Sequence, residues 1–247
     1  MRKLSPPKAI SHAISSVVTY RREALRIGMF WIPALFVLGL VRLLAGDGDP
    51  AAGQLDAPTL LDIASTALGL VAFSSMAVSW HRFILRDEHS APWRLDRLVL
   101  RYIGNSLLIV VMAGVPMLIA VGLGSMVPAL SILLLPLSLA AGTLVTALSV
   151  KLPAVALDRG DFTFRMAWEA CKGSLWQVLG VFLLNAAIVL GIFFVVVLSV
   201  IGIGALSPAA GKVALLVADA VTALVVALLN ASVFTSLYGF FVERRDF

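Results

Sequence analysis

The stretch WQVLGVFLLNAAIVLGIFFVVVLSVIGIGA, residues 176–205, runs for thirty residues without a charged side chain. An α-helix rises 1.5 Å per residue, so about 20 apolar residues are enough to cross the hydrocarbon core of a bilayer. This stretch therefore predicts a transmembrane helix that is longer than the core requires and must tilt or bend.

Five further apolar runs occur in the chain. The fold class that they predict is all-α, a polytopic membrane protein with six transmembrane helices and a single membrane domain covering residues 1–247. We expect the spans near residues 27–44, 60–80, 102–124, 128–150, 176–205 and 213–241.

The composition agrees with this fold class. Of the 247 residues, 60% are hydrophobic and 13% are charged, and the mean hydropathy is +1.01. A soluble domain carries about a quarter charged residues, which this chain lacks. The single cysteine, Cys171, excludes an internal disulfide and a cysteine-based metal cluster.

The basic residues are distributed unevenly between the two sides of the predicted membrane. All but two of the 19 Lys and Arg residues fall in the N-terminal segment, the second-to-third and fourth-to-fifth connections, and the C-terminus; the exceptions are Arg42 and Lys212. The first loop on the other side instead carries Asp47, Asp49 and Asp56. The positive-inside rule then places both termini in the cytoplasm, and the preference for Arg over Lys favours a bacterial inner membrane. Such short clusters between apolar runs are typical of topology signals, so we expect no nucleic-acid partner.

Each predicted pair of spans follows a basic amphipathic segment, in residues 6–26, 94–102 and 164–175. We expect three interfacial helices, of which the first starts at Ser5-Pro6 and the third has Asp161 as its N-cap and an Arg165–Glu169 pair. Basic helices of this kind bind anionic headgroups, or serve only to anchor and orient the bundle. The candidate headgroup contacts are Arg22, Arg26, Arg94, Arg97, Arg101, Arg165 and Lys172.

Two stretches carry a resemblance to known membrane proteins. WHRFILRDE, residues 80–88, looks like a segment of uncharacterised alphaproteobacterial proteins of this size. LPAVALDRGDFTFRMAWEACKGSLWQVLGVFLL, residues 152–184, resembles uncharacterised bacterial inner-membrane proteins and the membrane domain of some glycerophosphoryl diester phosphodiesterases. The resemblance implies a fold and a compartment but no activity, because catalysis in those enzymes belongs to a separate soluble domain.

A few polar residues interrupt the predicted spans and form a candidate intramembrane site. Asp219 is the foremost, since an intramembrane carboxylate is costly and usually faces a bundle interior or a cavity. It is either a proton or cation site or a structural partner of Arg42. The other candidates are Arg42, Asp62, Asn185 and Asn230. Asp62 is a second possible partner of Arg42, but its shallow depth favours plain solvation, and the two asparagines are suited to hydrogen bonds between helices.

The remaining polar residues give no catalytic, cofactor or metal signature. Trp80, His81 and Arg82 are expected to anchor the second span at the cytoplasmic interface. Asp158 and Asp161 are paired carboxylates near a basic residue, which is a pattern that headgroup chemistry could use.

Three functions therefore stay open. The first is a non-enzymatic accessory component of a membrane complex or of envelope homeostasis, with lipids and further proteins as partners. The second is a small-solute or proton-coupled transporter that uses Asp219. The third is a lipid-headgroup-modifying enzyme that uses Asp158 and Asp161.

Overall fold

The structure is a computed structural model that describes residues 4–45, 59–89 and 93–245. Within these ranges all regular structure is helical: α1 (Pro6–Thr19), α2 (Arg21–Gly28), α3 (Trp31–Ala45), α4 (Leu60–Arg86), α5 (Arg97–Met126), the 3-10 helix η1 (Pro128–Leu133), α6 (Leu134–Leu148), α7 (Lys151–Ala156), α8 (Phe164–Cys171), the 3-10 helix η2 (Lys172–Ser174), α9 (Leu175–Leu206) and α10 (Pro208–Phe241). Asp47, Asp49 and Asp56, expected in the first outer loop, lie outside the described residues.

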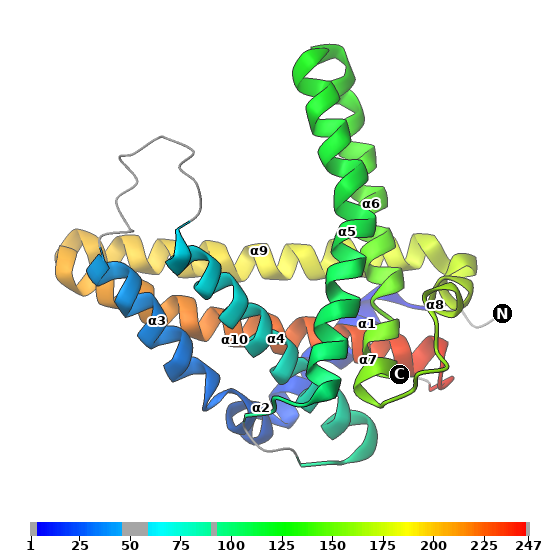
Figure 1. Cartoon of the computed structure of the whole chain (residues 1–247), viewed down its shortest axis with the longest axis horizontal. Helices are drawn as coiled ribbons and strands as arrows, with labels where there is room; N and C mark the ends of the chain where they lie inside the picture. The colour runs from blue at the N-terminus through cyan, green and yellow to red at the C-terminus, as the bar shows by residue number, and fades with distance from the viewer. Residues whose placement is uncertain (1–3, 46–58, 90–92, 246–247) are drawn as a thin grey trace.

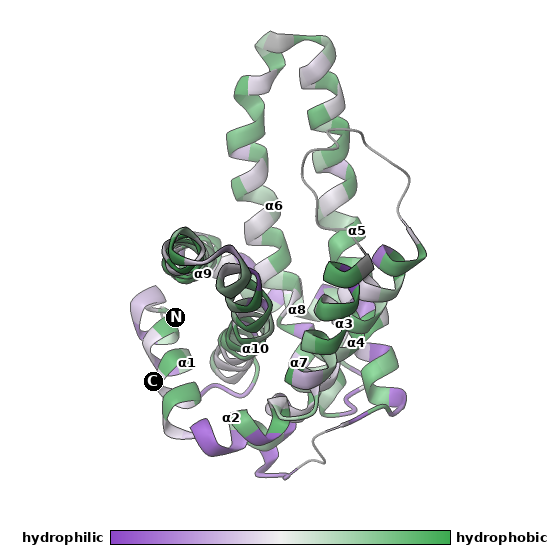
Figure 2. Cartoon of the chain, turned by 90° about the vertical axis from the view of Figure 1, so that its left-hand side faces the viewer, coloured by the Kyte–Doolittle hydropathy of each residue, from purple (hydrophilic) through white to green (hydrophobic). Residues whose placement is uncertain are grey.

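Three helical hairpins diverge from a common end of the molecule (Figure 1). The α9/α10 hairpin lies horizontally in that view, the α5/α6 hairpin rises from it, and α3 and α4 run obliquely. Turning the molecule by 90° shows α9 and α10 almost along their axes while α5 and α6 still stand upright (Figure 2). In this view most hydrophilic residues (purple) lie near the lower end, where the hairpins meet, and the hairpins themselves are mainly apolar (green). The shared end is therefore the more polar end of the molecule.

Five of the described helices are long and apolar enough to cross a membrane, and six if α2 and α3 form one bent span. The bend between α2 and α3 is 45°, at a break around Met29 and Phe30. Alone, α3 measures only about 22 Å, which is less than the hydrocarbon thickness. The predicted first span, residues 27–44, is thus the one that departs most from a continuous helix.

The buried core is concentrated at the end where the hairpins meet. The buried residues of α4 begin at Ala72, and nearly all those of α10 lie from Ala220 onward. The core has two clusters, one that includes Trp80 of α4 and Tyr102 of α5 and a second that includes Ala154 of α7 and Tyr238 of α10. The far halves of the hairpins expose their apolar side chains, as lipid-facing helices do.

The N-terminal amphipathic segment is broken in two. Tyr20 separates α1 from α2, so the prediction of one helix over residues 6–26 is wrong, although Ser5 and Pro6 do start α1. Ala9, Ile10 and Ala13 are buried because α1 packs against α9 and α10. Part of the apolar face expected to enter the membrane is therefore occupied by protein.

The other two amphipathic segments have different outcomes. The second is not a separate helix, because Asp96 caps α5 and Arg97 already belongs to its first turn. The third is confirmed as α8, but its N-cap is Thr163, whose hydroxyl oxygen accepts a hydrogen bond from Met166 N at 3.2 Å, and not Asp161. Glu169 pairs with Lys172 and not with Arg165.

The turn between α9 and α10 is tighter than predicted. Ser207 is the one residue between the two helices, and its side chain accepts a hydrogen bond from Ala210 N at 3.4 Å. Lys212, expected in a loop, belongs to α10. A Cβ at Gly211 would lie 2.6 Å from the Cα of Gly204, so the two helices meet backbone to backbone.

Candidate functional site

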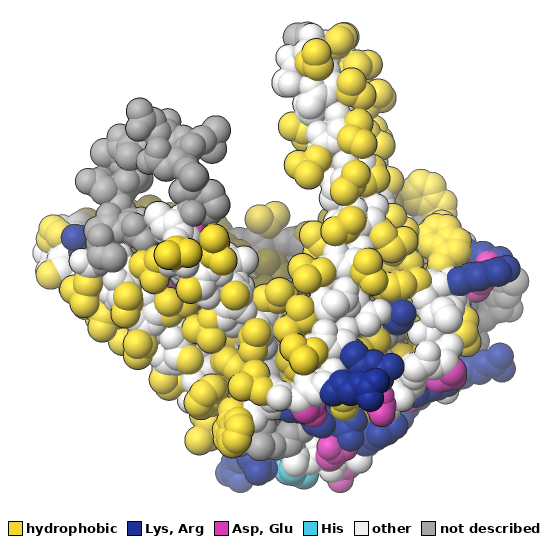
Figure 3. Space-filling view, in the orientation of Figure 1, with side chains coloured by type: hydrophobic (Ala, Val, Ile, Leu, Met, Phe, Trp, Pro, Cys, Tyr) yellow, Lys and Arg dark blue, Asp and Glu magenta, His cyan; other side chains and the backbone are white. Residues whose placement is uncertain are grey.

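The polar end of the molecule carries most of the basic side chains. Figure 3 shows Lys and Arg gathered along the lower and right-hand side, whereas hydrophobic side chains cover the hairpins above. We call this region the basic end; its residues include Arg82, Arg86, Arg94, Arg97, Arg101, Lys151, Arg159 and Arg165.

The C-terminus of α7 organises the basic end. Arg159 N donates to Ala154 O at 2.9 Å and Asp158 N donates to Val155 O at 3.0 Å, which is the hydrogen-bond pattern of a Schellman motif. Asp158 takes the left-handed conformation that this motif requires, with φ of 58°. Aspartate tolerates that conformation better than most side chains, so the local sequence favours the turn.

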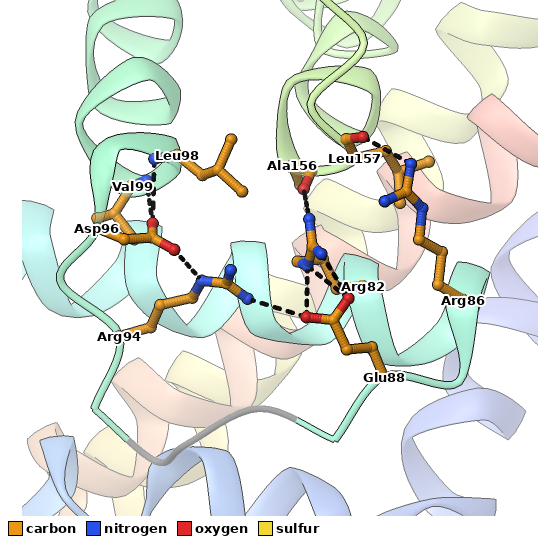
Figure 4. Close-up of polar contacts among 9 residues, drawn as sticks. All are labelled: Arg82, Arg86, Glu88, Arg94, Asp96, Leu98, Val99, Ala156 and Leu157. Atoms are coloured by element: carbon orange, nitrogen blue, oxygen red, sulfur yellow. Dashed lines mark hydrogen bonds and ion pairs between the residues drawn. The ribbon is translucent and has the colours of Figure 1, made fainter.

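Two arginines of α4 donate hydrogen bonds to the carbonyls of α7 that the Schellman motif leaves without a backbone partner (Figure 4). Arg82 Nη1 donates to Ala156 O at 3.0 Å, and Arg86 Nη2 donates to Leu157 O at 2.7 Å. Helix C-termini carry partial negative charge, so cationic donors stabilise them. These bonds join α4 to α7 across 74 and 71 positions of sequence.

Glu88 pairs with Arg82 and lies near a third arginine, Arg94. It accepts hydrogen bonds from Arg82 Nε at 2.9 and 3.0 Å and from Arg82 Nη2, and its Oε1 lies 3.7 Å from Arg94 Nη1 (Figure 4). The Arg82 hydrogen bond lowers the pKa of Glu88 against the opposing effect of partial burial. Arg82 is only 12% exposed, so Glu88 compensates a cation that water reaches poorly.

Asp96 connects this cluster to α5. Its carboxylate accepts hydrogen bonds from Leu98 N and Val99 N at 3.0 and 3.2 Å and from Arg94 Nε at 2.6 Å. Partial burial raises the pKa of Asp96, but the Arg94 hydrogen bond and the two backbone donors outweigh it and leave that pKa below its ordinary value. Arg94 is therefore engaged by carboxylates of the protein and is only 18% exposed, which disfavours the predicted headgroup contact there.

A small pocket lies between α5 and the segment from α7 to Phe162. It has a volume of about 70 Å³, and its charged lining residues are Arg101, Lys151, Asp158 and Arg159. Arg101 Nη1 lies 2.7 Å from Asp158 Oδ1, and Arg159 Nη1 donates to the Tyr238 hydroxyl at 2.8 Å. Asp161, expected to act with Asp158, does not line this pocket and lies 3.7 Å from Arg159 Nη2.

The other predicted headgroup contacts are at the surface. Arg22, Arg97 and Arg165 are exposed and make no ion pair with the residues that the structure describes. Arg26 lies 3.5 Å from Glu23, and Lys172 pairs with Glu169. These side chains remain accessible to solvent or to headgroups, which is compatible with the prediction.

Trp80 and His81 are fully buried, so the prediction that they anchor α4 at the interface is wrong. Trp80 Nε1 donates to Ser232 Oγ at 2.7 Å, and His81 Nδ1 lies 2.7 Å from Thr235 Oγ1. His81 Nε2 lies 3.3 Å from the Tyr102 hydroxyl. Hydroxyls on α10 and α5 allow these rings to be buried with their polar atoms paired, and the arrangement joins three helices.

A larger cavity of about 460 Å³ lies between α1 and the ends of α4 and α10. His12, Tyr20, Asp87, Ser236 and Arg245 are among its lining residues. His12 Nδ1 lies 3.0 Å from Ser236 Oγ, and burial, with Arg245 nearby, lowers the pKa of His12. Residues from both ends of the chain line this cavity.

The five residues of the predicted intramembrane site do not form one site in the structure but lie at three separate positions. Arg42 Nη2 lies 2.6 Å from Asp62 Oδ1, so Asp62 pairs with Arg42 where its shallow depth favoured plain solvation. Asn185 Nδ2 donates to Asn230 Oδ1 at 2.8 Å and joins α9 to α10. Asp219 is exposed on α10 and makes no hydrogen bond or ion pair with the described part of the chain, so it does not join either pair.

Sequence reasoning missed the functions of Arg82, Arg86 and Glu88 at the basic end. The available signal was the Leu157-Asp158-Arg159-Gly160 turn, since a helix end followed by an Asp-Arg-Gly segment leaves carbonyls that nearby arginines can satisfy. Which arginines reach them depends on how α4 packs against α7, and hydropathy carries no information about that.

Comparison with known proteins adds no relative: no family model, no curated protein and no solved structure matches this chain.

Proposed function

We propose that the protein is a non-enzymatic accessory component of a membrane protein complex, in a bacterial inner membrane with both termini in the cytoplasm. In this proposal the surface of α10 around Asp219 binds a transmembrane helix of a different protein. The observation that carries it is the exposed position of Asp219 on a membrane-spanning helix.

The depth of Asp219 makes its exposure costly. It lies seven residues after the charged Lys212, about 10 Å further along α10, and the hydrocarbon core is about 30 Å thick. A carboxylate at that depth costs a few kcal/mol unless a polar group compensates it. Arg42 is already engaged by Asp62, so a donor from another polypeptide fits this position better than one from the described chain.

A second copy of the chain fits less well. A symmetric contact through α10 would bring two Asp219 carboxylates together, and like charges at close range disfavour ionisation and association. The expected partner is a transmembrane helix with a basic or amide side chain at the depth of Asp219. Transport or headgroup chemistry lacks a comparable observation, because Asp219 does not face the interior and Asp161 does not line the pocket of Asp158.

A photo-crosslinking side chain at Ala223, one turn from Asp219 and also exposed, tests the proposal in native membranes. We expect it to capture one transmembrane peptide with a basic or amide residue. Asp219→Ala should reduce the yield at least tenfold, whereas Val221→Ala, an exposed α10 position on another side, should leave it unchanged. Capture of lipid alone, of a second copy, or of the same peptide with Asp219→Ala would contradict the proposal.

A further inference from the structure

The small pocket at the foot of the α5/α6 hairpin has an uncompensated positive charge. Three cations and one carboxylate line it: Arg101, Lys151, Arg159 and Asp158. Asp158 pairs with Arg101 at 2.7 Å, and Asp161 lies 3.7 Å from Arg159 outside the pocket. One positive charge therefore remains after both carboxylates are counted.

That charge belongs to Lys151, the first residue of α7. Its ammonium lies 4.0 Å from the centre of the Phe164 ring and contacts no carboxylate in the described ranges. The residue is only partly exposed, and a partly desolvated cation that has a ring as its neighbour is favourably placed to receive an anion. Lys151 and Val155 are four residues apart, so one face of α7 presents both to the pocket.

The size of the pocket limits the anion. A volume of about 70 Å³ holds a few water molecules, so it favours an anionic group as compact as one phosphate. A phosphodiester carries a single negative charge, so it would neutralise the pocket. Arg101 and Arg159 add donors of the kind that bind phosphate oxygens.

The position of the pocket points to lipid as the source of the phosphate. Arg101 lies in the second turn of α5 and Lys151 near the end of the span that contains α6, so the pocket is at the end of the α5/α6 hairpin. Figure 3 shows basic side chains directly below the apolar surface of that hairpin. Acyl chains can lie along the exposed faces of α5 and α6 while the phosphate occupies the pocket.

We propose that this pocket binds the phosphate group of an anionic phospholipid. The inference is independent of the partner proposed for α10, because the two sites share no residue and lie on different hairpins. It also differs from general attraction between exposed arginines and headgroups, because it assigns the lipid to one pocket of defined lining.

Native mass spectrometry of the full chain in detergent, titrated with phosphatidylglycerol or phosphatidylcholine, tests this inference. We expect the first phosphatidylglycerol to bind at least tenfold more tightly than phosphatidylcholine. Lys151→Gln should weaken it about tenfold or more, since the variant loses a charge-assisted hydrogen bond to the phosphate. Lys151→Arg, which keeps the charge, should retain binding within a few-fold.

The matched control is Lys212→Gln, which makes the same substitution at an exposed position near the start of α10 and outside the pocket lining. It should change the affinity less than threefold. Equal losses of phosphatidylglycerol affinity in the two Gln variants would overturn the proposal. Equal affinity of the wild-type chain for phosphatidylglycerol and phosphatidylcholine would also overturn it, and this comparison does not require that Lys151→Gln folds. Inorganic phosphate should bind more weakly than phosphatidylglycerol, and the opposite order would assign the pocket to a soluble phosphate and overturn the lipid source.

Discussion

The contribution of Glu88 to stability depends on the burial of its partner Arg82 more than on the burial of Glu88 itself. Its carboxylate is 39% exposed, yet it contacts Arg82, which is 12% exposed and holds the C-terminus of α7. An exposed ion pair contributes little, because water screens it, but a poorly solvated cation left without its partner is costly. The structural importance of Glu88 follows from the position of Arg82.

We expect Glu88→Gln to lower the free energy of unfolding by about 1 kcal/mol, a shift of about 2–4 °C in the thermal midpoint in detergent at pH 7. Because the folded state lowers the pKa of Glu88, its contribution is present above the ordinary value of 4.5 and is lost as the pH falls through the folded pKa. The difference between wild type and Glu88→Gln should therefore shrink below pH 4.5. Glu169→Gln, which breaks an exposed pair with Lys172, is the control and should shift the midpoint by less than 1 °C. A difference that grows on acidification would contradict this interpretation.

Helices α9 and α10 meet backbone to backbone at a pair of glycines, which have no side chain to hold the helices apart. Gly211 of α10 and Gly204 of α9 meet at the Ser207 turn, and any Cβ at Gly211 would overlap the backbone of the partner helix. Small residues at helix contacts permit this close approach in membranes. The turn therefore depends on Gly211 for a steric reason.

We expect Gly211→Ala to destabilise the α9/α10 hairpin by about 1–3 kcal/mol, because the helices must separate to admit the methyl group. Gly202 of α9 is the matched control, since nothing lies within 4 Å of the position that its Cβ would occupy. Gly202→Ala should be neutral or stabilising by up to about 1 kcal/mol, through helix propensity alone. Thermal unfolding of both variants in detergent measures the difference, and equal midpoints would show that the glycine contact is not required.

On the scale of the whole molecule, the hairpins share one polar end and expose their apolar surface elsewhere (Figure 3). The core and the arginine contacts lie at that end, so the three hairpins are held together there. The divergent halves leave room for lipid or for a partner's helices between them. Both proposals use this arrangement, one at the basic end and one on an exposed hairpin.

Orientation in the membrane is testable with single cysteines, because the native Cys171 is buried and the wild-type chain serves as an unlabelled control. Trp93→Cys is near the basic end and Leu206→Cys is at the α9/α10 turn, and both wild-type side chains are exposed. With a membrane-impermeant maleimide we expect Leu206→Cys to react in intact cells and Trp93→Cys only after permeabilisation. Labelling of Trp93→Cys in intact cells would reverse the topology inferred from the basic residues.

The sequence alone determined the helical class, the approximate positions of the long apolar helices and the grouping of the basic residues. These properties depend on the composition of short stretches of sequence. A long apolar stretch in hydrocarbon must satisfy its backbone hydrogen bonds internally, and a helix is the structure that does so within one segment. The Arg42–Asp62 pair was only an alternative at the level of sequence, since the shallow position of Asp62 favoured solvation, and the structure decided it.

The tertiary structure decided which polar groups meet. Arg82 reaches Ala156, His81 lies between Thr235 and Tyr102, and Lys151 faces a pocket with Arg101. Each contact joins helices distant in sequence, and it depends on how those helices rotate and pack against one another. Hydropathy describes how apolar a helix is but not which of its faces meets a neighbour. It therefore predicts interface anchors where the structure buries Trp80 and His81, and an inward position for Asp219, which the structure exposes.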